Sequence, residues 1–409
     1  MVSKNETMAA YCFGISMFVF RLSIALGNIF FILGIIFCIS ILYQKKKTNS
    51  LRTLYEDDNL KKTYKIFGIM MLSMVPSIIF SSNFTVSIKA ISDLWLYRSL
   101  MFFAIPLFIR DRKLLETIFI AFVTIEAIEG IVAVYQVLVL QLHRGVGFNI
   151  TVLEYAGILL VLLPVIIVCM IDDKVGPFLR KSSIILFPFL VAGAIAGQSR
   201  GLWLIILAVS PILVFKYVIK NKKYLAVVSI IVITIVGGFI STPELTQRVY
   251  SITNTTTDRS NADRILLWES TVEMIKDHPI VGVGTGNWYA VYKTQYENEE
   301  VTQKHLNHSH SNYLQIISET GVIGILGFLV FSIYMIFGNF IDWKRFGNPY
   351  SLMLFGVWFS FSAFGFIDHS IGSSANAKTL WYITGILLAL KMNWNNNFKE
   401  KEIGKIEGY

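Results

Sequence analysis

The sequence predicts an all-α polytopic membrane protein of about twelve transmembrane helices, with one large loop outside the membrane. Hydrophobic residues make up 54% of the 409 residues and charged residues only 15%, whereas a soluble protein usually carries about 25% charged residues. The apolar residues also gather in runs, many of them close to the roughly 20 residues that a helix needs to cross the hydrocarbon core. Lipid is therefore the predicted solvent for most of the chain.

The apolar runs give the expected spans in order. They lie near residues 8–20, 23–43, 65–82, 94–110, 114–140, 152–171, 183–198, 201–219, 223–240, 321–340, 350–367 and 378–392. The first two are also compatible with one long element that bends around Arg21. The first run continues past the usual length of a cleaved signal sequence, which indicates a retained anchor. All three cysteines fall inside apolar runs, which favours a structural role.

The basic residues predict the topology. A net charge of +9 would suggest nucleic acid as a partner of a soluble protein, but in membrane proteins Lys and Arg accumulate in cytoplasmic loops. With a cytoplasmic N-terminus and twelve alternating spans, each short inside loop is basic and each short outside loop holds at most one cation. Both termini are therefore expected on the cytoplasmic side of the membrane, and no nucleic-acid partner is expected.

This topology divides the chain into three parts. Residues 1–240 form a bundle of about nine spans, residues 241–320 form the large extracytoplasmic loop, and residues 321–409 hold the last spans and a cytoplasmic tail. Loops of that length are uncommon and usually functional. Within the loop, 262–276 has the pattern of a short amphipathic helix that ends at Asp277-His278-Pro279. The glycines that follow, at 282, 284 and 286, predict a tight irregular turn, because no strand precedes them as a dinucleotide fingerprint requires.

Two arginines of the predicted outer face are candidate anion-binding residues. Arg200 lies between two apolar spans with hardly any loop between them, and Arg264 lies near the start of the amphipathic helix. A guanidinium presents a rigid fork of donors that suits phosphate oxygens. The alternatives are an interfacial arginine at lipid headgroups for Arg200 and a surface salt bridge with Asp263 or Glu269 for Arg264.

Histidines and an acid supply candidates for proton transfer. His308 and His310 precede a span, and histidine is the side chain best suited to accept a proton near neutral pH. Asp368 lies at the outer end of the eleventh span, where the cost of an acid predicts a partner such as Arg200 or His310. Surface histidines and a solvent-exposed cap are the alternatives. No third ligand at a recognisable spacing supports a metal, so no metal site and no cofactor are expected.

These motifs, in this order, resemble the O-antigen ligase and O-antigen polymerase superfamily of bacterial envelope glycosyltransferases. The resemblance covers about residues 150 to 370. It rests on Gly197-Gln198-Ser199-Arg200-Gly201, Arg264-Ile265-Leu266-Leu267-Trp268, Asp277-His278-Pro279-Ile280-Val281-Gly282-Val283-Gly284, His308-Ser309-His310-Ser311-Asn312-Tyr313-Leu314-Gln315 and Glu319-Thr320-Gly321-Val322-Ile323-Gly324. One departure is Ser311, where members of the family often have Asn directly after the second histidine.

The resemblance implies a GT-C-like, metal-independent glycosyltransferase that uses a polyprenyl-diphosphate-linked oligosaccharide as donor. On that basis His310 is the expected general base, supported or replaced by His308. Arg200 and Arg264 are expected to bind the diphosphate, with Arg144 as a third cation and Asp368 in support. The acceptor is either a lipid A–core sugar, as in a ligase, or a growing polysaccharide, as in a polymerase.

Other activities stay open at this point. The sequence does not separate ligase from polymerase, although the compact chain with one dominant loop favours the ligase. A related branch of the superfamily glycosylates protein Ser or Thr. A transporter of lipid-linked glycans is the alternative from another class, but it requires a path of charged residues through the spans. Arg98 is the clear cation inside a predicted span, and Glu116, Glu126 and Glu129 share one helix.

Overall fold

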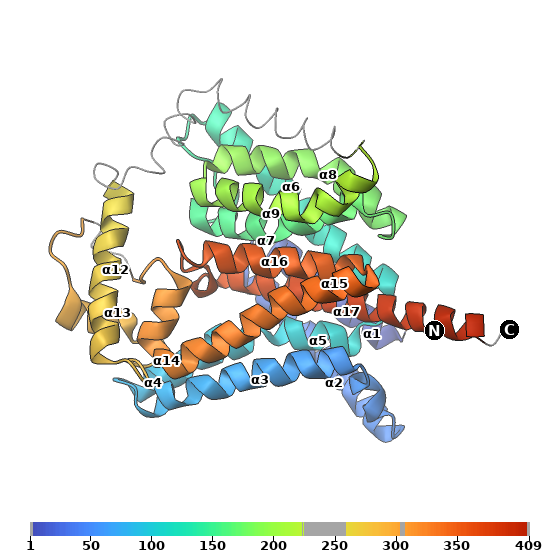
Figure 1. Cartoon of the computed structure of the whole chain (residues 1–409), viewed down its shortest axis with the longest axis horizontal. Coiled ribbons are helices and arrows are strands. Elements are labelled where there is room, and N and C mark those ends of the chain that lie inside the picture. The colour runs from blue at the N-terminus through green and yellow to red at the C-terminus, as the bar shows by residue number, and fades with distance from the viewer. Residues whose placement is uncertain (1–2, 223, 225–258, 303–306, 407–409) are drawn as a thin grey trace.

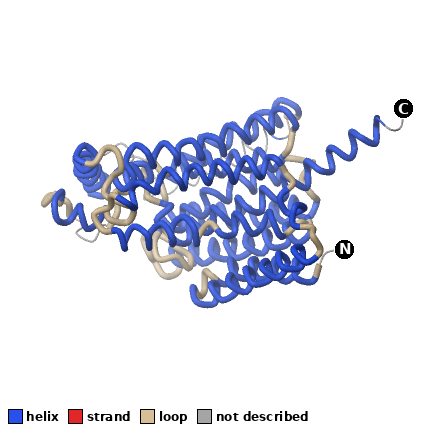
Figure 2. Tube along the Cα trace, turned by 90° about the horizontal axis from the view of Figure 1, so that it is seen from below, coloured by secondary structure: helices blue, strands red, loops and turns tan. Residues whose placement is uncertain are grey.

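The computed structural model describes residues 3–222, 224, 259–302 and 307–406, and within them every regular element is helical (Figures 1 and 2). The α-helices are α1 Lys4–Val19, α2 Ile24–Lys47, α3 Asp58–Ile79, α4 Phe84–Ile91, α5 Leu100–Phe108, α6 Arg112–Leu138, α7 Val152–Ile171, α8 Pro177–Gly197, α9 Arg200–Lys220, α12 Arg259–Asp277, α13 Trp288–Val291, α14 Asn312–Ile333, α15 Asn339–Phe346, α16 Pro349–Phe364 and α17 Ser374–Ile406. Short 3₁₀ turns lie at Leu51–Tyr55 and Ser370–Gly372, and π-helical turns at Ser92–Tyr97, Tyr292–Tyr296 and Tyr334–Gly338.

The all-helical, membrane-spanning fold class is confirmed. Seven helical segments of the described residues are long and apolar enough to cross a membrane, and α16 is a shorter apolar helix. Helices also lie over each predicted span except 223–240, which falls outside the described residues. The total of twelve spans therefore stays a prediction.

Local sequence signals explain where the helices begin. Asp57, Asp111, Thr151 and Ser311 stand just before α3, α6, α7 and α14, and each side chain accepts a hydrogen bond from a backbone N–H of the first helical turn. Ser23 does the same for α2. Because α1 ends at Val19 and α2 has its own cap, the first two apolar runs form two separate helices that pack on each other.

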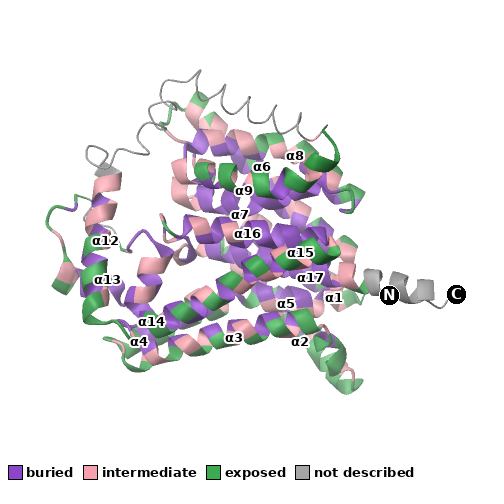
Figure 3. Cartoon of the chain, viewed as in Figure 1, coloured by how far each residue is buried: buried purple, intermediate pink, exposed green. Residues whose placement is uncertain are grey.

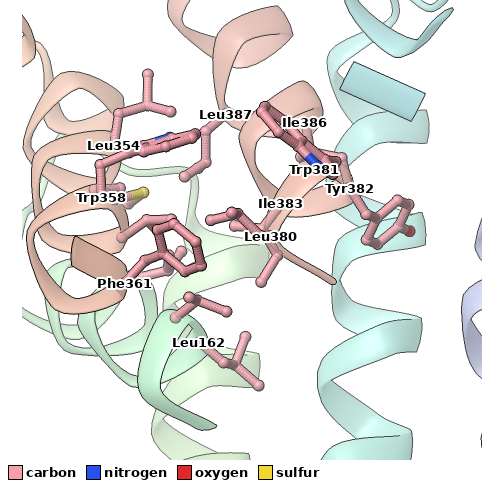
Figure 4. Close-up of a cluster of buried hydrophobic side chains, with 14 of the residues drawn as sticks. Leu162, Leu354, Trp358, Phe361, Leu380, Trp381, Tyr382, Ile383, Ile386 and Leu387 are labelled. Carbon is pink, nitrogen blue, oxygen red and sulfur yellow. The ribbon is translucent and has the colours of Figure 1, made fainter. Parts of the chain in front are cut away.

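Three helices form the centre of the bundle. In the most hydrophobic stretch of α7, 78% of the residues are buried, compared with 28% in the corresponding stretches of α2, α8 and α9. Helix α7 packs against α16 and α17, and much of these helices is buried (Figure 3). Hydrophobic side chains of the three helices meet in one buried cluster (Figure 4). Trp358 and Trp381 lie there with ring centroids 5.6 Å apart, and the Trp358 indole donates to the Thr384 hydroxyl at 3.2 Å. The exposed apolar faces of the outer helices are those expected to meet lipid.

A second buried cluster is ionic and lies between α1, α2, α6 and α17. Arg21 was predicted on the outer surface, yet its side chain is only 3% exposed. Its Nε lies 2.8 Å from Glu126 Oε1 and 3.4 Å from Glu129 Oε1, and its Nη2 donates to Thr379. Glu126 and Glu129 are one helical turn apart, so both face the same guanidinium. We call Arg21, Glu126 and Glu129 the internal ion cluster.

The two ends of the bundle differ in the segments that lie there. Helices α12 and α13 cover one end, which we call the α12 end, and both chain termini lie at the opposite end (Figures 1 and 2). The predicted topology, in which the termini and the large loop lie on opposite sides of the membrane, stays a prediction.

The predicted loop helix is present, since α12 spans Arg259–Asp277 and ends at the predicted Asp-His-Pro motif. It buries Leu267 and Met274 against Val283, Trp288 and Tyr292. The glycine-rich turn then crosses a break in α14. Val283 and Gly284 donate backbone hydrogen bonds to the carbonyls of Ser318 and Glu319, and Gly321 leaves the helical conformation at φ 61° and ψ −168°. A Cβ at Gly321 would lie 2.1 Å from the Ile280 carbonyl oxygen, so this turn needs glycine for packing.

Candidate functional site

Arg200 is held at the α12 end by a very short helix–helix junction. Helix α8 ends at Gly197, Gln198 takes a left-handed conformation with φ 49°, and Ser199 caps α9. Arg200 is therefore the first residue of α9. The partial positive charge of a helix N-terminus adds to that of the guanidinium at this position. Arg200 Nη2 lies 3.4 Å from Asn261 Oδ1 of α12.

Arg144 reaches the same junction from the loop between α6 and α7. Its guanidinium donates to the carbonyl oxygens of Gly197 at 3.1 Å and Gln198 at 3.2 Å. Gln198 returns a hydrogen bond from its side chain to the His143 carbonyl oxygen at 2.9 Å. These bonds tie the loop to the start of α9, so that Arg144 and Arg200 stand together.

Arg264 completes a group of three arginines around one cavity. The cavity has a volume of about 400 Å³ and is lined by all three guanidinium-bearing residues, Arg144, Arg200 and Arg264. Its other described lining residues are apolar or uncharged, namely Leu153, Gln198, Ser199, Gly201, Leu204, Asn261, Phe364 and Ile367. The space, which we call the arginine cavity, thus combines a cationic part with an apolar part.

Asp263, one of the two alternative partners considered for Arg264, also binds Thr302. The carboxylate of Asp263 is buried and accepts hydrogen bonds from the Thr302 backbone N–H at 3.0 Å and from the Thr302 hydroxyl at 2.8 Å. This interaction fixes the start of α12 to the loop that follows α13.

The segment with the two histidines is fixed on both sides of Ser309. The Trp268 indole of α12 donates to the Ser309 carbonyl at 2.9 Å, and the Ser309 N–H donates to Gln315 Oε1 at 2.8 Å. His310 has a φ of 51°, a conformation that residues other than glycine rarely adopt and that occurs often at functional sites. Its backbone N–H donates to His308 Nδ1 at 3.1 Å.

Asp368 meets His310, one of its two predicted partners. His310 Nδ1 and Asp368 Oδ1 are 3.6 Å apart, and both side chains are largely buried. The backbone holds them together, because the Asn312 N–H donates to the carbonyl oxygens of Gly365 at 2.7 Å and Asp368 at 3.2 Å. With Nδ1 facing the carboxylate, Nε2 is the nitrogen of His310 that remains for a substrate.

His308 and His369 share this site but differ electrostatically from a free histidine. Burial lowers the pKa of His308 to about 4, and the neighbouring His310 and Arg264 contribute in the same direction while Asp368 opposes them. Burial, followed by the neighbouring histidines and Arg98, lowers the pKa of His369 well below its usual value. Both imidazoles are therefore neutral at pH 7.

The arginine cavity and the histidines are parts of one region. Phe364 and Ile367 line the cavity, and Ile367 directly precedes Asp368. Arg264 lies close enough to His308 to influence its pKa, and Trp268, one turn further along α12, bonds to Ser309. All six predicted site residues thus lie at the α12 end: His308, His310, Arg144, Arg200, Arg264 and Asp368.

The site also contains three residues that were not among the predicted site residues. Asn261 and Gln198 contact the arginine cavity, and the ring of His369 lies 5.4 Å from that of His308. Gln198 belongs to the motif that contains Arg200, and His369 directly follows Asp368, but nothing in the spacing of Asn261 distinguishes it from other polar residues of the loop. Within the described residues, no group of three or more His, Cys, Asp or Glu side chains is arranged to hold a metal ion.

Fold and site together define a polytopic membrane protein with an arginine cavity beside a buried histidine–aspartate pair. A family model described as O-Antigen ligase matches residues 185–329. The match confirms the resemblance to the O-antigen ligase superfamily and, with the apolar helices, indicates a glycosyltransferase-type membrane protein of the bacterial envelope. A comparison with curated proteins found no match. Arg200, Arg264 and both histidines of the motif lie inside the matched region, whereas Arg144 and Asp368 lie outside it.

Proposed function

We propose that this protein transfers a glycan from a polyprenyl-diphosphate carrier to a hydroxyl group of a lipid A–core sugar, on the outer face of the bacterial inner membrane. The observation that supports this most directly is the convergence of Arg144, Arg200 and Arg264 on one cavity of about 400 Å³. Three guanidiniums match the charge and the donor requirements of a diphosphate. The apolar lining from α7, α9 and α16 suits the first isoprene units of the carrier.

In the proposed reaction, the acceptor hydroxyl gives its proton to Nε2 of His310 as its oxygen attacks the anomeric carbon of the donor sugar. The bond from that carbon to the diphosphate oxygen breaks, and the lipid diphosphate leaves as an anion. Asp368 orients the imidazole and stabilises its protonated form. The arginines stabilise the charge that grows on the leaving diphosphate. A single displacement of this kind inverts the configuration of the anomeric carbon.

Two features support His310 over His308 as the base. His308 already accepts the His310 backbone N–H through Nδ1, and its pKa of about 4 makes it a poor proton acceptor at neutral pH. His310 instead has a carboxylate 3.6 Å from Nδ1. His308 then acts as a positioning residue that holds the strained backbone of His310.

The test is glycan transfer by purified protein with a polyprenyl-diphosphate oligosaccharide, a lipid A–core acceptor and EDTA. We expect wild-type protein to transfer, and His310→Ala to lower kcat by about 10²–10⁴-fold, the usual contribution of a general base. His278→Ala is the matched control, because His278 is exposed at the same end of the molecule. Transfer by His310→Ala at the wild-type rate would contradict the role of this residue, and a requirement for metal would contradict the metal-independent mechanism.

The products of the same reaction distinguish the ligase from the polymerase. One addition to each acceptor identifies a ligase, whereas a ladder of repeat units identifies a polysaccharide polymerase. Binding of the donor without transfer to either kind of acceptor would favour the transporter of lipid-linked glycans instead.

A further inference from the structure

An exposed aromatic side chain stands next to the proposed catalytic pair. Phe366 lies in the loop between α16 and the turn Ser370–Gly372 and is 63% exposed. Its neighbours Phe364 and Ile367 line the arginine cavity, but Phe366 does not. The loop thus places Phe366 outside the space assigned to the diphosphate.

The ring of Phe366 is supported from behind by Tyr313. Their ring centroids are 4.4 Å apart with an interplanar angle of 33°. The Tyr313 hydroxyl donates to the Ser362 carbonyl oxygen at 2.9 Å, and its ring also packs against Phe328. Tyr313 is therefore anchored at its hydroxyl and within the bundle, while the Phe366 side chain that it supports remains mostly exposed.

Backbone hydrogen bonds fix this aromatic pair beside His310. The Gly365 carbonyl oxygen, directly before Phe366, accepts from the Asn312 N–H at 2.7 Å and from the Ser311 hydroxyl at 3.1 Å. Asp368, two residues after Phe366, faces the His310 imidazole. The same two segments, 310–313 and 365–368, therefore carry both the proton-transfer pair and the aromatic pair.

We propose that Phe366, supported by Tyr313, is a stacking platform for the sugar ring of the acceptor. A pyranose has an apolar face of C–H groups that packs on an aromatic ring, while its hydroxyls stay free at the rim. A sugar on Phe366 presents a hydroxyl towards His310, and the arginine cavity remains for the donor diphosphate. This inference rests on the proposed function and assigns the acceptor's side of the same site.

Steady-state transfer kinetics of Phe366→Ala, Phe366→Leu and Phe366→Trp test the platform. With the donor saturating, we expect Ala and Leu to raise the KM for the acceptor by about 2- to 12-fold, the size of one aromatic contact. The Trp variant should stay close to wild type, and the donor KM should change in none of them. Leu is the decisive variant, because it keeps apolar volume and loses the aromatic face.

Phe84→Ala is the control, since Phe84 is a 56% exposed aromatic residue at the start of α4. It should leave both KM values unchanged. An unaltered acceptor KM in Phe366→Ala and Phe366→Leu would overturn the proposal. A change in unfolding temperature without a change in KM would identify Phe366 as an aromatic anchor at the membrane interface.

Equilibrium binding separates a failure of the platform from a failure of the proposed function. Isothermal titration of nanodisc-embedded protein with two lipid-free oligosaccharides, a core sugar chain and a repeat unit, requires no turnover. Weaker binding by Phe366→Ala and Phe366→Leu than by wild type would support the platform even if no transfer occurred. Failure of wild type to bind both oligosaccharides, or equal binding by all variants, would overturn it.

Discussion

The internal ion cluster and the arginine cavity each contain an arginine at a junction between two consecutive helices, but different side chains surround the two arginines. Arg21 and Arg200 each stand between two consecutive apolar helices. Arg21 faces two carboxylates of α6 and is closed off from solvent, whereas Arg200 joins two further arginines at a cavity. A cation at a span junction therefore stabilises the fold or forms part of a site according to the side chains that other helices bring to it.

The internal ion cluster places two carboxyl groups around one guanidinium. Two acids and one guanidinium are buried together, and Glu129 also accepts a hydrogen bond from the Asn149 side chain at 2.6 Å. A buried ion pair that loses one partner leaves a charge without compensation in a poorly solvating environment. Substitutions in this cluster should therefore affect the fold, whereas substitutions at the arginine cavity should affect the reaction.

Replacing Arg21 should damage the fold more than any substitution in the arginine cavity. Arg21→Ala leaves Glu126 and Glu129 facing each other, and we expect a loss of about 3–5 kcal/mol in unfolding free energy. Thermal unfolding in detergent, with the amount of folded protein in the membrane, measures this. Arg21→Ala combined with Glu126→Gln and Glu129→Gln should recover part of the stability, because the excess negative charge is removed. Equal destabilisation of the single and triple variants would show that packing, not charge, is responsible.

Replacing Arg200 should lower the activity strongly and change the stability little. Arg200→Ala removes one donor from the arginine cavity, and we expect kcat/KM for the donor to fall by about 10²–10³-fold, as for other groups that stabilise a leaving anion. The unfolding temperature should change little, because Arg200 lies at the wall of a cavity. Arg200→Lys keeps the charge but loses the fork of donors, so it should recover activity only in part.

Arg345→Ala is the matched control for that measurement, since Arg345 is exposed in the last turn of α15. It should leave transfer unchanged. Full activity of Arg200→Ala would show that Arg200 has no role in the reaction. A large loss of stability in the same variant would show that Arg200, like Arg21, stabilises the fold.

How far the sequence predicts this molecule depends on the range of the interactions involved. Apolar runs predict the helices of the bundle, because burial in lipid depends on local composition, and the predicted end of the loop helix agrees with α12. The burial of Arg21 could not be predicted in the same way, because it depends on the packing of α6 beside the junction of α1 and α2. No local sequence pattern contains that information. The convergence of Arg144 with Arg200 likewise depends on the hydrogen bond from Arg144 to Gly197, which lies 53 residues later in the chain.

The segment with His308 and His310 could also be predicted only in part from the sequence. Its position before a span is readable from the sequence, and the interaction of Asp368 with His310 was one of two predicted alternatives. The left-handed backbone of His310 and the role of Gln315 in holding Ser309 were not predicted, because both result from the contact between α12, α14 and the loop after α16. Packing thus decides how each side chain of the motif is used.

A further predicted effect is a dependence of stability on pH that comes from His308. Its pKa is about 4 in the folded protein, below the usual 6.5 or so of an unfolded chain. Between these values the unfolded state binds more protons, so stability should decrease as the pH falls from about 6.5 towards about 4. The slope contributed by one such group is at most about 1.4 kcal/mol for each pH unit.

His308→Gln should remove this part of the pH dependence, because glutamine retains an acceptor oxygen and does not titrate. Thermal unfolding of both proteins across this pH range measures the difference, and His278→Gln serves as the control at an exposed site. The pKa of His369 is also lowered in the folded protein, so part of the loss of stability at acidic pH should persist in the variant. An identical pH profile for wild type and His308→Gln would mean that the pKa of His308 is the same in the folded and unfolded states, and it would contradict the effect of burial on this histidine.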